Sequence, residues 1–381
     1  MKGRIIFISN SVYPTADSGG GSVVVYRHLK RFEKEGKEVV IINSLPNKSR
    51  SSEFKEIYLD KKQWYPPIRK NWPILTNIRV WLEVQYILKK LKPTEGDVVL
   101  SILGDYTNLL ALQISKRYTL PLHMIYHDDS LFNRYERENT LTKSHVKAIV
   151  KKVNCFYAVS KPMQTLLIEN GAELVKLLYP IPEGNILNKL PAWKPSFEVN
   201  LELCYAGMLL EDAHFDILKK VSDAISYNGI FTILTNVNPL FEKKISHSLR
   251  IKIEKQILNK KELFEYLISN FSSLLVFYSF DSYKEPRMCT SFPSKFCEFV
   301  HLGLPIILIA PTYSAIGKWA IENNWKTYIS SDSQNEIRKI LLKLKNREYW
   351  EACSSQSREV ADQYFNPEKI HSILSQSMFL D

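Results

Sequence analysis

The fold of this chain is decided by the stretch Arg287-Met-Cys-Thr-Ser-Phe-Pro-Ser-Lys-Phe-Cys-Glu-Phe-Val-His-Leu-Gly-Leu-Pro-Ile-Ile-Leu-Ile-Ala310. A continuous apolar run, 273–278, precedes it, and a second run, 305–309, lies at its end. Unbroken runs of β-branched, aromatic and aliphatic residues are typical of strands that are buried on both faces of a parallel sheet. The stretch is therefore predicted to connect two neighbouring buried strands.

The segment between these two runs predicts a helix with one buried face. Pro293 stands where a proline is best tolerated, in the first turn, and Gly303 predicts the end of the helix. Four apolar residues recur at helical spacing, namely Phe296, Phe299, Val300 and Leu302. Unpaired N–H groups and the helix dipole make the N-terminal end of such a helix favourable for anions. The strand-loop-helix unit thus predicts an anion site.

Polar side chains gather at the same end of this predicted helix. Thr290 and Ser291 supply hydroxyls from the loop, and Ser294 and Lys295 add a hydroxyl and a cation. Glu298 follows one turn later, where a carboxylate can accept two hydrogen bonds from a vicinal diol such as ribose. Phosphate beside ribose indicates a nucleotide. The alternative is a surface helix on which Glu298 and Lys295 are solvated charges.

Strand and helix patterns alternate along the whole chain, which is typical of parallel sheets covered by helices. Strands are expected at 4–8, 38–42, 97–102, 122–126, 155–159, 174–178, 201–206, 230–234, 249–253, 274–278, 306–309 and 326–329. Helices are expected at 22–35, 108–118, 141–152, 161–170, 215–227, 334–344, 347–364 and 367–378. The proline-rich segment 179–195 lacks periodicity and indicates a linker between two domains.

Residues 291–307, Ser-Phe-Pro-Ser-Lys-Phe-Cys-Glu-Phe-Val-His-Leu-Gly-Leu-Pro-Ile-Ile, resemble the donor-binding motif of GT-B-fold glycosyltransferases. The resemblance is to the large retaining group often called family 4, in which two glutamates eight positions apart precede Gly-x-Pro-Val. Glu298 matches the second glutamate, and the first falls on Thr290, as in relatives with a Pro-Ser-Lys form. Four further segments, 6–21, 36–42, 158–171 and 179–182, are similar to this group in the same order.

The resemblance implies an α/β protein of GT-B fold, with two doubly wound Rossmann-like domains facing across a cleft and a last helix crossing back to the first domain. The acceptor-side domain would be 1–185 with 365–381, and the nucleotide-sugar domain 196–364. The implied activity is a metal-independent, retaining transfer of a sugar from a nucleotide-diphosphate donor, without a cofactor. The family commonly carries Arg and Lys after the position of Gly207, where this chain has Met-Leu-Leu-Glu-Asp-Ala-His.

Two sequence features of the first half are candidates for this site. Gly20 and Gly21 belong to a three-glycine loop that precedes a helix with Ser22 as its expected cap, and such a loop admits a close ligand. His127 and Asp128 follow a strand at the edge where α/β sheets bind ligands, and the resemblance gives them catalytic roles at the sugar ring. The alternatives are a flexible surface turn and a polar pair that caps a strand end.

Four polar residues at similar positions are candidates for binding acceptor hydroxyls. Tyr13 and Asp17 lie in the first loop, and Asp105 and Asn108 follow the strand at 97–102. Helix capping is the alternative for Asp105 and Asn108.

Composition points to a negatively charged partner. The net charge is +11 over 381 residues, which favours a nucleotide or an anionic membrane over a specific nucleic acid, for which no motif is present. The stretch 61–81 interleaves cations with tryptophan and tyrosine, as lipid interfaces favour, or it is a partly packed insertion. The first residues, 1–9, are expected to form an edge strand and not a signal peptide, so we expect a cytoplasmic protein, peripheral on the inner face of the membrane.

Five scattered cysteines without a Cys-x-x-Cys pair are expected to be buried thiols and not zinc ligands or disulfides. The acceptor would be a glycan or a lipid-linked glycan in bacterial surface polysaccharide assembly, of O-antigen or capsule type. Two other functions remain compatible with the sequence: a GT-B nucleotide-sugar epimerase or hydrolase, and a catalytically silent GT-B partner subunit.

Overall fold

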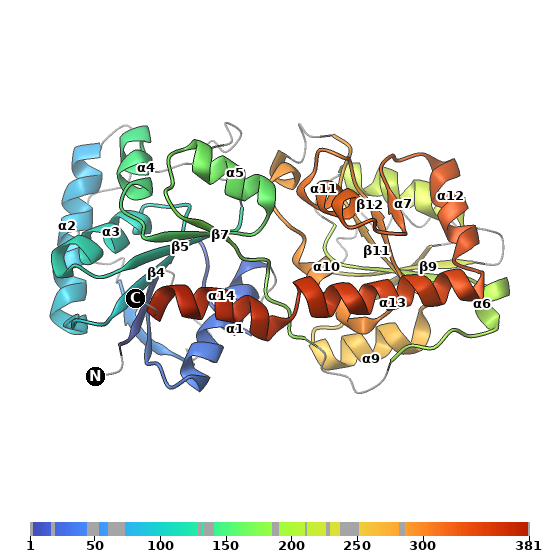
Figure 1. Cartoon of the computed structure of the whole chain (residues 1–381), viewed down its shortest axis with the longest axis horizontal. Helices are drawn as coiled ribbons and strands as arrows, with labels where there is room; N and C mark the ends of the chain where they lie inside the picture. The colour runs from blue at the N-terminus through green and yellow to red at the C-terminus, as the bar shows by residue number, and fades with distance from the viewer. Residues whose placement is uncertain are drawn as a thin grey trace. The chain divides into compact units, whose positions relative to one another are not determined.

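The computed structural model describes residues 3–16, 20–43, 53–59, 73–128, 132, 141–184, 190–209, 212–225, 229–236, 251–281 and 286–379. It divides the chain into two compact units. Unit 1 comprises Met1–Ile181, Thr290–Phe292 and Glu368–Asp381, and unit 2 comprises Pro182–Cys289 and Pro293–Pro367. Each unit is an α/β fold around a parallel sheet, as the alternating pattern of the sequence predicts (Figure 1).

The sheet of unit 1 has the strand order β3-β2-β1-β4-β5-β6-β7, and all of its pairings are parallel. Its strands are β1 (Ile5–Ile8), β2 (Val39–Asn43), β3 (Lys55–Tyr58), β4 (Val98–Ile102), β5 (Leu122–Tyr126), β6 (Cys155–Ala158) and β7 (Val175–Leu177). The helices are α1 (Gly21–Lys34), α2 (Pro73–Leu91), α3 (Thr107–Tyr118), α4 (Lys143–Val150), α5 (Lys161–Glu169) and α14 (Pro367–Phe379).

The sheet of unit 2 has the order β10-β9-β8-β11-β12-β13 and is also parallel. Its strands are β8 (Glu202–Ala206), β9 (Ile230–Thr235), β10 (Ile251–Lys255), β11 (Ser273–Phe277), β12 (Ile306–Ile309) and β13 (Tyr328–Ile329). The α-helices are α6 (Ser196–Val199), α7 (Asp212–Ala224), α9 (Lys260–Asn270), α10 (Ser294–Phe299), α11 (Ala315–Glu322), α12 (Gln334–Lys343) and α13 (Arg347–Tyr364). Two short 3₁₀ helices, η1 (Pro286–Cys289) and η2 (Val300–Leu302), flank α10 in sequence.

Several local expectations need correction. β1 pairs with both β2 and β4, so it is an interior strand and not an edge strand. Gly20, and not Ser22, is the N-cap residue of α1, and no side chain caps this helix. Pro293 is the N-cap residue of α10 and precedes its first turn. Strand β3 and helices α2, α9 and α11 were not predicted. Short polar strands and basic aromatic stretches such as β3 and the region before α2 give a weak periodic signal.

The predicted buried face of the α10–η2 segment is confirmed. Phe296, Phe299, Val300 and Leu302 are all buried, and Gly303 ends η2 with a positive φ of 68°. The cysteines are free thiols, four of them buried, with Cys289 half-buried. Within the described part of the chain, no helix is long and apolar enough to cross a bilayer.

Helix α14 packs beside α1 in unit 1 (Figure 1), as the predicted return of the last helix requires. The contact contains two buried histidines, with His28 Nδ1 and His371 Nδ1 3.1 Å apart. Loss of hydration lowers the pKa of His28 well below its usual value, and the neighbouring His371 ring lowers it further. His371 also has a lowered pKa for the same reason, although Glu35 Oε1 lies 3.1 Å from its Nε2 and opposes the shift.

We expect the α1–α14 contact to weaken in mild acid. A histidine that stays neutral when folded but takes up a proton when unfolded destabilises the folded state once the pH falls below about 6.5. Lowering the pH from about 7.5 to about 5.5 should cost about 1 kcal/mol for His28 alone. The protection factors of α1 and α14 amides, measured by hydrogen–deuterium exchange and corrected for the slower intrinsic exchange in acid, should fall accordingly.

His28→Asn is the matched variant, because the asparagine side chain can place a polar atom near the position of Nδ1 but does not titrate. Its protection factors should fall less in acid than those of the wild-type chain. An equal fall in both proteins would contradict the assignment to His28.

Candidate functional site

In unit 2 the chain runs from β11 through η1 to α10 and then to β12, so the quoted stretch does connect two adjacent strands. Aromatic packing fixes α10 in place. The ring of Phe296 lies 5.2 Å from Trp319, 5.1 Å from Trp325 and 5.9 Å from Phe365, measured between centroids. With its inner face anchored in this way, α10 presents Ser294 and Lys295 from the opposite side of its first turn.

Lys295 lies against Gly207, which follows strand β8. A Cβ atom added at Gly207 would be 1.7 Å from Lys295 Nζ, so the ammonium occupies the space of the missing side chain. The Tyr205 ring lies beneath it, with 5.3 Å from Nζ to the ring centroid. Because loss of hydration and the nearby Lys260 both disfavour its charge, the pKa of Lys295 is lowered to about 8.

No carboxylate within the described residues forms an ion pair with Lys295. A largely desolvated cation without an acidic partner is costly, and an anionic ligand would offset this cost. The arrangement of Gly207 and Lys295 therefore suits an anion such as a phosphate. The helix dipole contributes less than the sequence suggests, because α10 has only six residues.

Glu298 is buried, and its carboxylate is held within unit 2 by Lys260 and Glu183, among other contacts. Lys260 Nζ lies 3.1 Å from Oε1, and the backbone N–H of Glu183 donates to Oε2 over 3.2 Å. The carboxylate is thus fixed in position by contacts from distant segments. Neither Lys260 nor Glu183 was predicted, since both come from distant segments and no spacing rule connects them to α10.

In unit 1 the glycine loop lies beside the predicted histidine. Gly20 has a φ of 60° and is the N-cap residue of α1. A Cβ atom at Gly21 would lie 3.6 Å from His127 Cδ2, so the loop and the end of β5 are in van der Waals reach. Nε2 of His127 is buried without a hydrogen-bond partner, and loss of hydration lowers the pKa of this histidine, opposed by Asp128.

Thr290 and Ser291 lie with unit 1, although their sequence neighbours on both sides belong to unit 2. Ser291 Oγ donates to Asp128 Oδ1 over 2.9 Å. Ser160 Oγ donates to the carbonyl of Thr290, and the hydroxyl of Thr290 is buried without a partner. Ser291 is thus close to the end of β5, and the backbone of Thr290 is close to Ser160, the N-cap residue of α5.

The predicted acceptor residues have different surroundings. Asn108 is fully buried, and its amide holds the β4–α3 loop through contacts of 2.7 to 3.1 Å with Ser101, Ile102, Gly104 and Asp105. Asp105 accepts from the backbone N–H of Thr107 over 2.7 Å, and burial raises the pKa of its carboxyl. Tyr13 is half-buried in the loop after β1, and Asp17 lies outside the described residues.

Among the described residues, no cluster of three or more histidine, cysteine or acidic side chains could hold a metal ion. Unit 2 therefore contributes a cation, the hydroxyl of Ser294 and a buried carboxylate, and unit 1 contributes a glycine loop, a histidine and the hydroxyls of Thr290 and Ser291.

No protein-family model matches this chain, and no curated protein sequence matches it either. Solved structures with a similar fold include sucrose-phosphate synthase from Thermosynechococcus elongatus, at 15% identity with a TM-score of 0.71, covering 98% of both chains. Anabaena HepE in complex with UDP and glucose is 12% identical, with a TM-score of 0.64, over 98% of this chain and 99% of that one.

A third similar structure is a putative UDP-N-acetylglucosamine 2-epimerase from Listeria monocytogenes, at 13% identity with a TM-score of 0.58. The match covers 100% of this chain and 97% of that one. At these identities the likeness shows the fold, which is two Rossmann-like units of GT-B type over the full length of the chain.

We expect Lys295 to titrate well below an ordinary lysine because its ammonium is desolvated. Competitive acylation, followed peptide by peptide with mass spectrometry, should give a half-reactive pH of about 8 for Lys295, compared with about 10.4 for an unperturbed lysine. In Gly207→Ala the added methyl group displaces the ammonium, so the midpoint should move upwards. A wild-type midpoint near that of an ordinary lysine would show that Nζ is fully hydrated.

Proposed function

We propose that this chain is a glycosyltransferase that transfers a sugar from a nucleoside-diphosphate donor to a glycan or lipid-linked acceptor. The single observation that carries the proposal is the desolvated ammonium of Lys295 against Gly207, without an acidic partner among the described residues. A diphosphate supplies the missing negative charge. The fold shared with HepE, a protein solved with UDP and glucose, supports a uridine nucleotide as the donor carrier.

In this proposal unit 2 holds the donor. Lys295 and Ser294 bind the diphosphate, Gly207 leaves room for the Lys295 ammonium, and the Glu298 carboxylate accepts hydrogen bonds from the ribose hydroxyls. When the bond between the sugar and the diphosphate breaks, negative charge grows on the departing oxygen. A preorganised cation stabilises that charge without reorganising at the moment of reaction, so Lys295 performs the task that a metal ion performs elsewhere.

Residues of unit 1 are assigned to the sugar and the acceptor. His127 has an unpartnered, buried Nε2 that can donate to or accept from a sugar hydroxyl, and Asp128 is oriented by Ser291. Gly20 and Gly21 leave the first N–H groups of α1 without a side-chain cap. Tyr13, Asp17 and Asp105 are assigned to the acceptor side. We further propose transfer with retention of anomeric configuration.

Nucleotide-sugar epimerisation is the second candidate, because a putative 2-epimerase shares the fold at a TM-score of 0.58. Product analysis separates the two. A transferase converts the donor to free nucleotide and a glycosylated acceptor, and NMR of that product gives its anomeric configuration. An epimerase yields an isomeric sugar in the absence of any acceptor, and a silent partner subunit changes neither substrate.

Lys295→Gln should weaken UDP binding by roughly thirtyfold, since a charge-assisted hydrogen bond to phosphate contributes about 2 kcal/mol. Isothermal titration calorimetry measures the change. Lys339→Gln is the matched control, because it removes the same charge from an exposed position on α12 of the same unit and should leave UDP affinity unchanged.

Glu298→Gln tests the ribose assignment separately. The wild-type chain should bind UDP more tightly than 2′-deoxy-UDP, and the variant should discriminate less between the two nucleotides. If Lys295→Gln and Lys339→Gln bind UDP equally well, the donor site lies elsewhere and the proposed function loses its support.

Exposed apolar side chains in the first turns of α2 support a contact between unit 1 and a membrane. Ile74, Ile78 and Trp81 are exposed by 73%, 44% and 60%, and their spacing places them on one face of the helix. Residues 61–72 of the predicted basic and aromatic stretch lie outside the described part of the chain. We propose that this face of α2 inserts into an anionic lipid surface, which would place the enzyme on the inner face of the membrane near a lipid-linked acceptor.

The full chain should sediment with vesicles that contain about a third anionic lipid, and less with neutral vesicles. The triple variant Ile74→Ser, Ile78→Ser, Trp81→Ala should lose most of this binding, because it removes the exposed apolar side chains of α2. Ile321→Ser removes a similarly exposed isoleucine from α11 and is expected to change nothing. Equal sedimentation of all three proteins would rule out α2 as the contact.

A further inference from the structure

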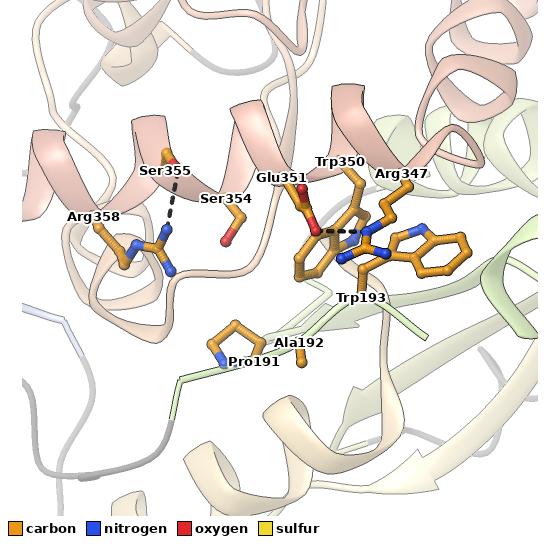
Figure 2. Close-up of a pocket in the computed structure, with 9 residues that line it drawn as sticks. All are labelled: Pro191, Ala192, Trp193, Arg347, Trp350, Glu351, Ser354, Ser355 and Arg358. Atoms are coloured by element: carbon orange, nitrogen blue, oxygen red, sulfur yellow. Dashed lines mark hydrogen bonds and ion pairs between the residues drawn. The ribbon is translucent and has the colours of Figure 1, made fainter. Parts of the chain in front are cut away.

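Unit 2 contains a pocket of about 400 Å³ that no predicted site residue lines. Its walls are residues 191–193 of the linker and, from α13, Arg347, Trp350, Glu351, Ser354, Ser355 and Arg358 (Figure 2). The α13 residues recur at spacings of three and four, so they form one face of that helix. A helix face that only packs against protein is apolar, whereas this one carries two arginines, a glutamate and two serines.

The inner wall of the pocket is fixed by buried contacts. Trp350 is fully enclosed, and its Nε1 donates to the carbonyl of Ser272 over 2.7 Å. Ser354 Oγ donates to the carbonyl of Gly303 over 2.6 Å. These contacts fix α13 against the start of β11 and the end of η2, so the α13 wall of the pocket is preformed in the way that small-molecule sites are.

One end of the pocket has an available cation. The stem of Arg358 lies beside Gly303, where a Cβ atom would be 3.3 Å from Arg358 Cγ and 3.4 Å from Pro191 Cδ. Its guanidinium donates to Ser355 Oγ over 3.0 Å and forms no ion pair with any described carboxylate. A guanidinium has five donors, so several remain for an oxyanion.

The opposite end of the pocket is lined by an ion pair and an indole ring. Arg347 is already paired with Glu351 over 2.8 Å and lies 5.8 Å from the centre of the Trp193 ring. Nε1 of Trp193 is buried and has no hydrogen-bond partner among the described residues. The Glu351 carboxylate repels a second anionic group here but accepts hydrogen bonds from hydroxyls, and the indole offers an apolar surface with a donor at its edge.

Arg358 and Glu351 are seven positions apart on α13, or about 10 Å along the helix axis, which is within the reach of a monosaccharide that carries one acidic group. They therefore suit two different parts of one ligand. We propose that this pocket binds a small acidic sugar, with its phosphate or carboxylate at Arg358 and its neutral, hydroxylated part between Trp193 and Glu351. The site is separate from the proposed donor residues and does not depend on the proposed transfer reaction.

Calorimetry on the full chain, with the donor site saturated by UDP, tests the proposal. Glucose 1-phosphate, glucuronate, glucose and inorganic phosphate are the probes. At least one acidic sugar should bind, and at least tenfold more tightly than glucose or phosphate alone, about 1.4 kcal/mol. Binding of only the phosphate or only the carboxylate sugar identifies the anionic group.

Arg358→Gln should weaken this binding by roughly tenfold or more. Arg338→Gln on the exposed side of α12 is the matched control and should bind like the wild-type chain, and both variants should keep their UDP affinity. Glu351→Gln should improve the binding of fructose 1,6-bisphosphate relative to glucose 1-phosphate, because it removes the repulsion at the Trp193 end. If the α13 face were purely structural, Glu351→Gln would not change the affinities of these two sugars relative to each other.

Three results would overturn the proposal: no acidic sugar binds, Arg358→Gln binds as well as Arg338→Gln, or uridine monophosphate binds more tightly than both acidic sugars in an Arg358-dependent manner. The last result would mean that Trp193 stacks on a base and not on a sugar.

Discussion

The contact between Lys295 and Gly207 is the constraint on which the interpretation of unit 2 depends. A lysine ammonium rests where any other residue would have a side chain, so glycine after β8 and lysine at the start of α10 require one another. The strand order makes this possible, because β8 and β11 are neighbours and α10 follows β11. Aromatic packing of Phe296 on the other side of α10 prevents the helix from moving away. Sheet topology and a buried aromatic cluster thus hold a desolvated charge in place.

The helices and strands that could be predicted are those whose sequence signal lies within the element itself or at its ends. Continuous apolar runs identified the interior strands, and Gly303 identified the end of η2, because each signal lies within a few residues. Strand β3 and helix α2 escaped prediction because their composition is mixed. The partners of Glu298 were not predictable either, since Lys260 and Glu183 reach it from segments that are close only in the folded chain.

Several candidate residues were correctly recognised as polar groups at strand ends, but sequence could not distinguish a scaffold role from a ligand role. Asn108 illustrates the difficulty. Its position after β4 is that of a ligand-binding residue in α/β proteins, yet its amide is entirely occupied by the loop that it supports. His127 occupies the equivalent position after β5 and retains an unpartnered nitrogen. The distinction lies in how many hydrogen bonds the surrounding backbone demands, which depends on loop conformation.

The path of the chain between the two units limits how one unit could be exchanged for that of another protein. The polypeptide passes from one unit to the other after Ile181, returns for Thr290–Phe292, and leaves unit 2 for good after Pro367. If two proteins were recombined at a single point in the linker, the resulting first unit would be incomplete, because it would lack α14 and the segment Thr290–Phe292. The face of α1 that packs against α14, including the buried Phe32 and His28, would then face water. Evolution or engineering can exchange unit 1 only by replacing three segments together, and unit 2 only by replacing two, which favours change by local substitution over domain shuffling.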